Sequence, residues 1–441
     1  MGAKFAPRHA LGILAPVLRS ASLARIRTPA LIFAVCAAVY VATLGQRALG
    51  PSDNSHFVHL ARSFLAGQAS VIGDRPPGNN DWAYYAGKWY VSFPAFPAVV
   101  ILPAVLIWAE HTRDPLFWAI VAGLGPALLY VLLRRLRELG QSQRTPREDL
   151  ALTALFAFGS AFFYVAVQGS VWFAAHVVAV PLIALYVLFA LRGSHPLLAG
   201  CMLGLLFWTR PSTMCLCVLF AIESLDATRR EGEANWLRSI DVRRVLPRWL
   251  WFALPILIAG GLAMWFNAAR FDDPFEFGHT HLRIRWKARI DKWGLTNYHY
   301  LAKNLAVFLA ALPWISSVSP YLKISRHGLA LWFTTPHYLG VLWPKRVSVT
   351  YVALAISAGA VALLDLCYQN SGWIQFGYRF SLDYAVLLVA MLAIGGRKQG
   401  AWWYVLLVFA IAVNLFGAIT FDRMWQFYDS DATQQVIFQP D

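Results

Sequence analysis

Uncharged apolar stretches of about 15 to 20 residues recur along the whole chain and alternate with short clusters of charged residues. A helix needs about 20 apolar residues to cross a hydrocarbon layer of about 30 Å. The pattern therefore predicts an all-α, polytopic membrane protein with about eleven transmembrane helices. The first expected span covers about 29–49 and the last about 401–421.

Basic residues in the connections fix the expected orientation, because membrane proteins retain Lys and Arg on the cytoplasmic side. Residues 1–28 carry five basic residues and no acidic ones, which predicts a cytoplasmic leader. The transmembrane domain then covers 29–421, with long external loops at about 50–114 and 267–328. Residues 422–441 would form an external tail.

Two apolar stretches are better explained without a full crossing. Phe93–Trp108 is interrupted by prolines, and a crossing there would export the arginine cluster that begins at Arg134, so we predict an interfacial helix in the first external loop. A single helix over 196–222 would hold Arg210 near the bilayer midplane, at a cost of at least about 2.5 kcal/mol. Two short helices that turn outside at Arg210-Pro211 avoid this cost.

A third apolar stretch determines on which side of the membrane the later connections are expected to lie. Residues 304–322 are uncharged apart from the flanks and long enough to insert. The flanking charges favour a placement outside the membrane. The alternative, a crossing, would invert the later spans and move Arg379 to the cytoplasmic side.

The composition supports the membrane assignment and narrows the function. Hydrophobic residues make up 58% of the 441 residues and charged residues 14%, whereas soluble domains carry about a quarter charged residues. The net charge of +15 arises from Lys and Arg beside apolar segments, so nucleic acid is not an expected partner. The five cysteines lie within or at the end of apolar runs, unlike a disulfide framework. The sequence has neither a P-loop nor a Gly-x-Ser-x-Gly motif, so it gives no support to an ATP-driven or a serine-hydrolase function.

Asp53 is the first candidate for chemistry, just past the first expected span. A carboxylate at the mouth of a membrane helix can act as a general base and take a proton from an acceptor hydroxyl. Asp53 equally suits the N-cap of a helix over 57–65, because Ser, Asp and Asn favour that position. Both interpretations stay open at this point.

Aromatic residues gather in the same loop around a second acid. Asp81 precedes Tyr85 and Trp89, with Lys88 among the rings. Rings near acids and a cation suit a sugar or a lipid headgroup, while an interfacial aromatic belt explains the same rings. We predict Asp81, Tyr85 and Trp89 as substrate-lining residues. His176 joins them, since an ionisable group inside an expected span is a functional candidate, with a hydrogen-bonded core histidine as the alternative.

An unusual number of arginines is expected on the external side, against the positive-inside trend. They are Arg210, Arg270, Arg283, Arg285 and Arg379. Guanidinium groups pair well with phosphate oxygens. A salt bridge or a headgroup contact would explain any one of them, but the group as a whole favours an anionic ligand.

One cluster in the second long external loop combines carboxylates with histidines. It contains Asp272, Asp273, Glu276, His279 and His281. Its spacing matches no strong metal-ligand signature, and Asp273-Pro274 is typical of a loop turn. No metal site and no cofactor are predicted, with a divalent cation as the alternative.

Several short motifs follow in order along the chain. A first helix leads to an external loop that opens with Asp53, followed by Ala86-Gly87-Lys88-Trp89-Tyr90 and the Pro-rich Phe93 to Pro97. Later segments are Trp208-Thr209-Arg210-Pro211, 267–278 (NAARFDDPFEFG) and 376–383 (FGYRFSLD). Over most of its length the chain resembles the membrane-embedded GT-C glycosyltransferases, such as protein O-mannosyltransferases and the aminoarabinose transferases that modify lipid A.

The resemblance implies a multi-helix fold with interfacial helices in the first external loop and a polyprenyl-phosphate-linked sugar as donor. Asp53 matches the position of the family's catalytic acid. Lys88 lies in a Gly-Lys-x-Tyr segment like the one that approaches the donor phosphate, and Arg379 is a looser match to a phosphate-facing cation. The second external loop, 168–172, lacks the carboxylate that many members carry there, which disfavours a metal-dependent mechanism.

The resulting hypothesis is an inverting glycosyltransferase of the cell membrane, expected in the bacterial cytoplasmic membrane. Asp53 would deprotonate the acceptor, while Lys88 and Arg379, with Arg210 or Arg270, would stabilise the leaving phosphate. The expected partners are the lipid-linked donor, a glycan, lipid or protein acceptor, and membrane lipids. The alternatives are a transporter or flippase for an anionic lipid-linked substrate, and a catalytically silent scaffold.

Overall fold

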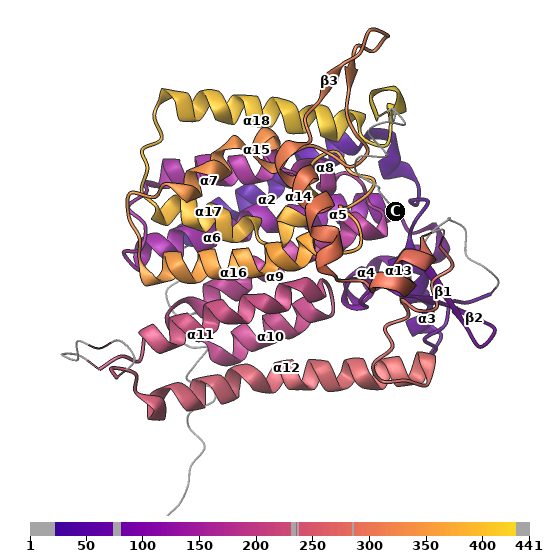
Figure 1. Cartoon of the computed structure of the whole chain (residues 1–441), viewed down its shortest axis with the longest axis horizontal. Helices are drawn as coiled ribbons and strands as arrows, with labels where there is room; N and C mark the ends of the chain where they lie inside the picture. The colour runs from indigo at the N-terminus through magenta and orange to yellow at the C-terminus, as the bar shows by residue number, and fades with distance from the viewer. Residues whose placement is uncertain (1–22, 74–80, 231–234, 236–237, 285, 429–441) are drawn as a thin grey trace, which may run out of the picture.

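The computed structural model describes residues 23–73, 81–230, 235, 238–284 and 286–428. Most of the predicted leader, Arg285 and most of the predicted tail lie outside this part of the chain. The long helices lie side by side with their axes roughly aligned, so the connections gather at two opposite ends of the bundle (Figure 1). The protein is a mainly helical membrane protein, as the hydropathy pattern predicts.

Six helical stretches in the described part of the chain are long and apolar enough to cross a membrane. They are α2 (Leu23–Leu44), the continuous pair α5 (Asp114–Ala122) and α6 (Leu124–Glu138), α9 (Val171–Ala190), α12 (Val242–Phe271), α16 (Val349–Leu366) and α18 (Ala401–Thr420).

The remaining expected spans are short or broken helices. They are α7 (Pro146–Phe158) with α8 (Phe162–Ala166), α10 (Pro196–Phe207), α11 (Cys217–Asp226), α15 (Leu331–Thr334) with a 3-10 turn at Pro336–Leu342, and α17 (Ala385–Ile394) after a 3-10 turn at Arg379–Asp383. Helix length alone therefore does not establish the predicted count of about eleven spans.

One end of the bundle, here called the basic end, collects the arginine-rich connections. Arg134 at the end of α6 donates a hydrogen bond to the carbonyl of Arg25 at the start of α2, at 2.8 Å. The backbone N–H of Lys345 donates to Gly395, at 2.8 Å, which joins the two later basic turns. The positive-inside rule predicts that this end faces the cytoplasm.

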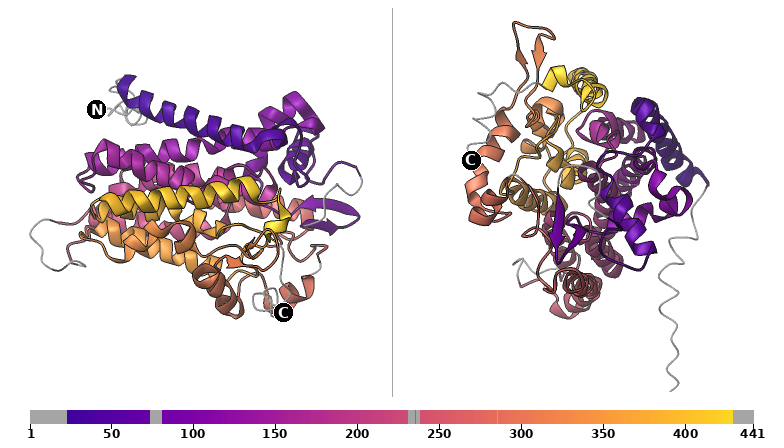
Figure 2. Two further views of the ribbon diagram at one scale, coloured as in Figure 1. Left: turned by 90° about the horizontal axis from the view of Figure 1, so that it is seen from above. Right: turned by 90° about the vertical axis from the view of Figure 1, so that its right-hand side faces the viewer.

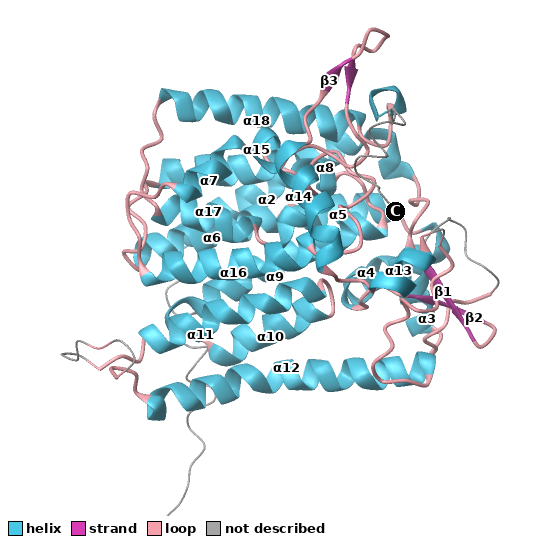
Figure 3. Ribbon diagram, viewed as in Figure 1, coloured by secondary structure: helices cyan, strands magenta, loops and turns pink. Residues whose placement is uncertain are grey.

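The opposite end, here called the loop end, holds the small elements (Figure 3). They are α3 (His56–Leu65), β1 (Trp82–Tyr85), β2 (Lys88–Val91), α4 (Phe96–Trp108), α13 (Lys287–Trp293), α14 (Leu301–Ala310), β3 (Trp314–Ile315) and β4 (Leu322–Lys323). The first hairpin turns through Ala86 (φ 47°) and Gly87 (φ 79°), the pair of positive values that a two-residue hairpin loop requires. These strands are small additions to a helical fold.

Helix α4, which the sequence places at the interface, starts and finishes at the loop end. Its first residue, Phe96, donates a backbone hydrogen bond to Trp208 at 2.9 Å. Just beyond its last turn, Glu110 pairs with Arg62 of α3 at 2.9 Å. A helix tied at both ends to the same side of the bundle does not traverse it.

The segment 196–222 breaks at Arg210, as expected from the cost of a buried guanidinium at mid-membrane. Helix α10 ends at Phe207, and a 3-10 turn over Pro211–Leu216 leads into α11. Because Trp208 bonds to the start of α4, this turn lies at the loop end. Arg210 therefore lies near the end of the bundle rather than at its middle.

The segment 304–322 forms no spanning helix. Asn304 in α14 donates to the carbonyl of Leu366 at the end of α16, at 2.9 Å. After the β3–β4 hairpin, Ile324 donates to Phe427, which follows α18, at 2.8 Å. The segment leaves and rejoins the bundle at the loop end, so Arg379 lies at the same end as Asp53.

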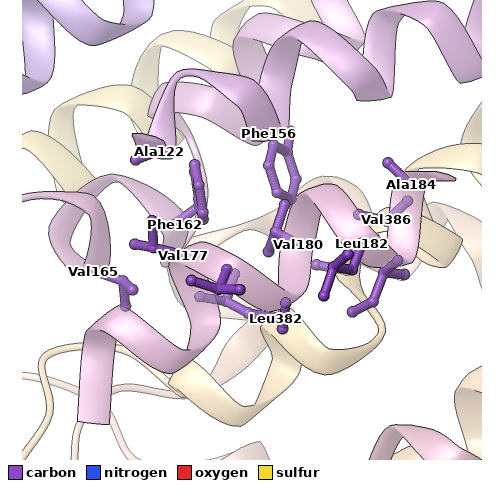
Figure 4. Close-up of a cluster of buried hydrophobic side chains, with 14 of the residues drawn as sticks. Ala122, Phe156, Phe162, Val165, Val177, Val180, Leu182, Ala184, Leu382 and Val386 are labelled. Atoms are coloured by element: carbon purple, nitrogen blue, oxygen red, sulfur yellow. The ribbon is translucent and has the colours of Figure 1, made fainter. Parts of the chain in front are cut away.

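The interior is built around α9, which is apolar on every face and almost entirely buried. Its Val177 and Val180 pack with Phe156 of α7 and Phe162 of α8 (Figure 4). Leu382, from the turn before α17, closes the same cluster. This packed region fills the bundle between its two ends.

Helix α12 lies at the edge of the bundle (Figure 2) and attaches to it mainly through α10. A Cβ on Gly200 of α10 would meet the carbonyl oxygen of Phe252 and lie 2.7 Å from Pro255 Cγ. Gly204, one turn later, faces Ala259. Small residues four apart let two membrane helices approach closely, so this pair sets the contact that holds α12.

Replacing Gly200 tests this contact. Gly200→Ala should lower the free energy of unfolding by about 1–3 kcal/mol, because α12 must move away to admit the methyl group. Gly261→Ala on α12 is the matched control, since nothing lies within 4 Å of its added Cβ. Thermal unfolding in detergent should show a lower Tm for the first variant alone; equal Tm values would contradict the packing.

Candidate functional site

A cavity of about 1730 Å³ lies at the loop end of the bundle. Its walls come from the α2–α3 connection, the start of α4, the start of α9, the turn after α10 and the ends of α12, α16 and α18. Five of the residues selected from the sequence line it: Asp53, Asp81, Arg210, Arg270 and Arg379. They come from five separate segments, and the folded chain brings them to one space.

Asp53 is exposed on the cavity wall and free to react. Helix α3 begins at His56 with Ser55 as its N-cap residue, and no side chain caps it, so the N-cap interpretation of Asp53 is wrong. Ser52 next to it is held by Asp114, whose Oδ1 accepts the Ser52 N–H at 2.7 Å. Among the described residues Asp53 has no hydrogen-bond or ion-pair partner, which leaves both carboxylate oxygens available.

Asp81, in the first long loop, makes a contact with the short connection at 168–172. The indole N–H of Trp172 donates to Asp81 Oδ2 at 2.8 Å, and Ser92 donates to the Asp81 carbonyl at 3.0 Å. Burial raises the pKa of the Asp81 carboxyl, and the indole hydrogen bond opposes that rise. The connection at 168–172 has no carboxylate in its own sequence. Asp81 places one beside it.

Arg379 is buried in the cavity wall and forms no ion pair with any described carboxylate. Its Nη1 donates to the carbonyls of Gly372 and Ile374, the latter at 3.0 Å. Its guanidinium carbon lies 5.3 Å from the ring centre of Phe173 and 5.2 Å from that of Phe380. Burial lowers the pKa of Arg379 to about 10, so the group stays cationic at neutral pH.

Arg270, in the last turn of α12, is held in the same way. Its side chain donates to the carbonyl of Val91 at 2.9 Å and to Asn267 Oδ1 at 2.7 Å, and it stacks 4.2 Å from the ring centre of Phe266. No carboxylate within the described chain forms an ion pair with Arg270 or Arg379. Asp81 interacts electrostatically with Arg379, and Glu276 with Arg270, but neither forms a direct ion pair. A buried charge without a direct counter-ion is costly, and an anion in the cavity would offset that cost.

Arg210 differs, because a buried acid neutralises it. Its Nη2 lies 2.6 Å from Asp383 Oδ2, and its Nε is 3.0 Å from the same oxygen. Ser212 donates to that oxygen at 2.9 Å, and His176 Nδ1 lies 3.1 Å from Asp383 Oδ1. Asp383 is fully buried. The pair closes the cavity floor and offers less charge to a ligand than Arg270 or Arg379.

Four predicted site residues do not line the cavity. His176 is fully buried in α9 behind Asp383, so it can act on the cavity only by holding that acid. Lys88 is exposed beside the hairpin turn. Tyr85 donates to Asp272 at 3.1 Å, and Trp89 packs 4.7 Å from the Tyr84 ring. The hairpin holds these three side chains away from Asp53.

The acidic and histidine-rich segment after α12 forms turns. Asp273 Oδ1 accepts the backbone N–H of Phe275 at 2.8 Å, and Glu276 accepts the Thr280 hydroxyl at 2.6 Å. Within the described residues, no group of three or more His, Cys, Asp or Glu side chains is arranged to hold a metal ion. Arg283 stacks 5.4 Å from the Tyr84 ring centre, outside the cavity lining.

Several acids of the site were not selected from the sequence, among them Asp365, Asp383 and Asp422. Asp383 and Asp365 lie in or beside apolar runs, where a carboxylate is unusual enough to be noticed. Asp422 follows α18 and pairs with Arg47 at 2.9 Å on the cavity wall. Its position on that wall depends on how the two ends of the chain pack, which no local pattern reveals.

No family model matches the sequence, and no curated protein matches it. Solved structures do resemble the fold. The apo oligosaccharyltransferase of Archaeoglobus fulgidus aligns with a TM-score of 0.49 and 14% identity, over 92% of this chain and 57% of that one. The same archaeon's AglB in complex with an inhibitory peptide and a dolichol-phosphate gives 0.44 and 12%, over 94% and 57%.

ArnT from Cupriavidus metallidurans bound to undecaprenyl phosphate aligns with a TM-score of 0.48 and 12% identity, over 85% of this chain and 61% of that one. These structural neighbours are GT-C membrane glycosyltransferases. The chain spans less than two thirds of the length of each of these structures.

The Arg210–Asp383 pair predicts strong coupling between two substitutions. Arg210→Gln and Asp383→Asn should each lower the free energy of unfolding by about 3–5 kcal/mol, because each leaves the other charge buried and unpaired. The double variant should lose less free energy of unfolding than the sum of the two single losses. Thermal or denaturant unfolding of the four proteins measures the coupling.

The matched control for this cycle is Lys287 and Asp291, an ion pair on the exposed surface of α13. Replacing both by Gln and Asn should change stability by less than about 1 kcal/mol. Strictly additive losses at Arg210 and Asp383 would show that the two groups do not depend on each other.

Proposed function

We propose that this protein is an inverting glycosyltransferase that moves a sugar from a polyprenyl-phosphate donor to an acceptor at the loop end, on the non-cytoplasmic face of the membrane. The observation that supports it is a single cavity that holds the exposed carboxylate of Asp53 and two buried guanidinium groups, Arg270 and Arg379, which form no ion pair with a carboxylate in the described part of the chain. The carboxylate suits the acceptor, and the guanidinium groups suit the donor phosphate.

In this reaction the acceptor hydroxyl oxygen forms a bond to the anomeric carbon, and the bond from that carbon to the phosphate oxygen breaks. The proton of the hydroxyl goes to Asp53, and the electron pair of the broken bond goes to the departing lipid phosphate. Arg270 and Arg379 would meet the charge that develops there without first reorganising, since their neighbours already hold them.

The walls of the cavity suit a substrate with a lipid chain. One side of α12 exposes large apolar residues where lipid would lie, including Leu257 and Trp265. The last turns of the same helix turn Ala263, Phe266 and Arg270 to the cavity. A donor could therefore keep its chain beside α12 while its phosphate reaches Arg270.

The main alternative is a transporter or flippase for an anionic lipid-linked substrate. A transporter needs a path to the other side of the membrane. Toward the basic end, the bundle is filled by the buried apolar side chains around α9 (Figure 4). This packing favours chemistry at one face, and flux of intact substrate in proteoliposomes without product would instead support transport.

Asp53→Asn tests the enzymatic proposal. Protein in liposomes made from native membrane lipids would receive radiolabelled polyprenyl-phosphate hexoses, and label in lipid, glycan and protein fractions would be counted. Loss of a general base should reduce turnover by about 10²–10⁴-fold. Asp291→Asn, an exposed acid outside the cavity, should leave turnover unchanged. Full turnover by Asp53→Asn would remove Asp53 from the mechanism.

Arg379→Gln and Arg270→Gln test the phosphate contacts separately. Each should weaken binding of polyprenyl phosphate by about 10- to 100-fold, because a hydrogen bond to a charged group contributes about 1.5–3 kcal/mol. Binding can be followed by tryptophan fluorescence in nanodiscs. Arg283→Gln, an exposed cation at the same end, is the control. Equal Kd values for all four proteins would place the phosphate elsewhere.

A further inference from the structure

Asp365 presents a buried, unpartnered carboxylate oxygen at the cavity wall. It lies in the last turn of α16 and is only 4% exposed. Its Oδ2 has no hydrogen-bond partner among the described residues, and the residue lines the cavity. A buried acceptor left without a donor is destabilising, and a ligand that donates a hydrogen bond would offset this cost.

The neighbouring cation does not meet this need. Arg210 lies close enough to Asp365 to interact electrostatically, but its ion pair is with Asp383. Ser212 donates to Asp383 and also lies within hydrogen-bonding reach of Asp365. Asp365 still keeps one carboxylate oxygen, Oδ2, that no described residue bonds.

The cavity that Asp365 lines has the chemistry of a sugar subsite. The rings of Tyr368, Trp373 and Phe380 line the same cavity, together with the amide side chain of Asn370. Flat apolar faces suit the C–H face of a sugar ring, and carboxylate and amide groups suit its hydroxyls.

The floor also lies within reach of the proposed phosphate site. The guanidinium carbons of Arg210 and Arg379 each lie 5.2 Å from the ring centre of Phe380. Asp365 lies beside Arg210, so the one aromatic ring separates the two subsites. A sugar is joined to its phosphate through a single oxygen, which allows both to be held at once.

We propose that Asp365 accepts a hydrogen bond from a hydroxyl group of the sugar on the lipid donor and so selects the sugar that is transferred. This inference rests on the proposed glycosyltransferase function. A site built to bond a hydroxyl rejects analogues that lack it strongly, because its own polar group is then left unpaired. Asp365 would be a specificity-determining residue, distinct from the proposed base Asp53.

The test compares two probes on the full chain in nanodiscs: undecaprenyl phosphate, and undecaprenyl phosphate that carries a hexose, tried with glucose, mannose and galactose. The wild type should bind one sugar-bearing lipid more tightly than the bare lipid. Asp365→Ala should weaken that binding by about 10-fold or more and leave the bare lipid within about 2-fold. Asp365→Asn keeps an amide oxygen that can accept a hydrogen bond. Its affinity for the sugar-bearing lipid should therefore lie between those of the wild type and Asp365→Ala.

Glu110→Gln is the control, because this cavity carboxylate is already paired with Arg62; it should preserve the difference between the two lipids. If Asp365→Ala changes neither affinity, or weakens both lipids equally, the sugar contact is wrong while the proposed function stands. If the wild type binds neither lipid, the proposed function itself fails and the inference with it. Thermal unfolding of Asp365→Asn separates binding from folding.

Discussion

The ion pair between Arg210 and Asp383 determines how charge is distributed in the cavity. It joins the turn after α10 to the turn before α17, and His176 and Ser212 complete the hydrogen bonds of the acid. Because Asp383 neutralises this guanidinium inside the protein, its main role is to stabilise the fold. The charges that remain unmatched are therefore those that a ligand can use.

Those unmatched groups divide the cavity into regions of different chemistry. Arg270 and Arg379 are buried cations held by carbonyls and aromatic rings. Among the described residues, Asp53 has no ion-pair partner, and Asp365 keeps one oxygen, Oδ2, without a hydrogen-bond partner. Cations and acids that line one cavity without cancelling each other suit a substrate with an anionic part and hydroxyl-rich parts. A lipid-linked sugar phosphate has this composition.

The outline of the fold was predictable because a membrane restricts what a chain can do. Positive-inside counting placed 93–108 and 304–322 outside the spans, and both segments lie at the loop end. The cost of a guanidinium at mid-membrane predicted the break at Arg210. The short and broken helices were less predictable, because their ends depend on neighbours such as Phe252, against which Gly200 packs.

The sequence by itself determined the membrane class, because hydropathy acts locally along the chain; from charge it also predicted an orientation and a set of candidate residues. Only the tertiary structure decided which candidates share a space: it gathered Asp53, Arg270 and Arg379 and left Lys88 on the hairpin. It also decided that Arg210 forms its ion pair with Asp383 and that Asp365 keeps one oxygen without a hydrogen-bond partner among the described residues. Pairing depends on contacts between segments hundreds of residues apart, as between Arg210 and Asp383, and no local pattern encodes such contacts.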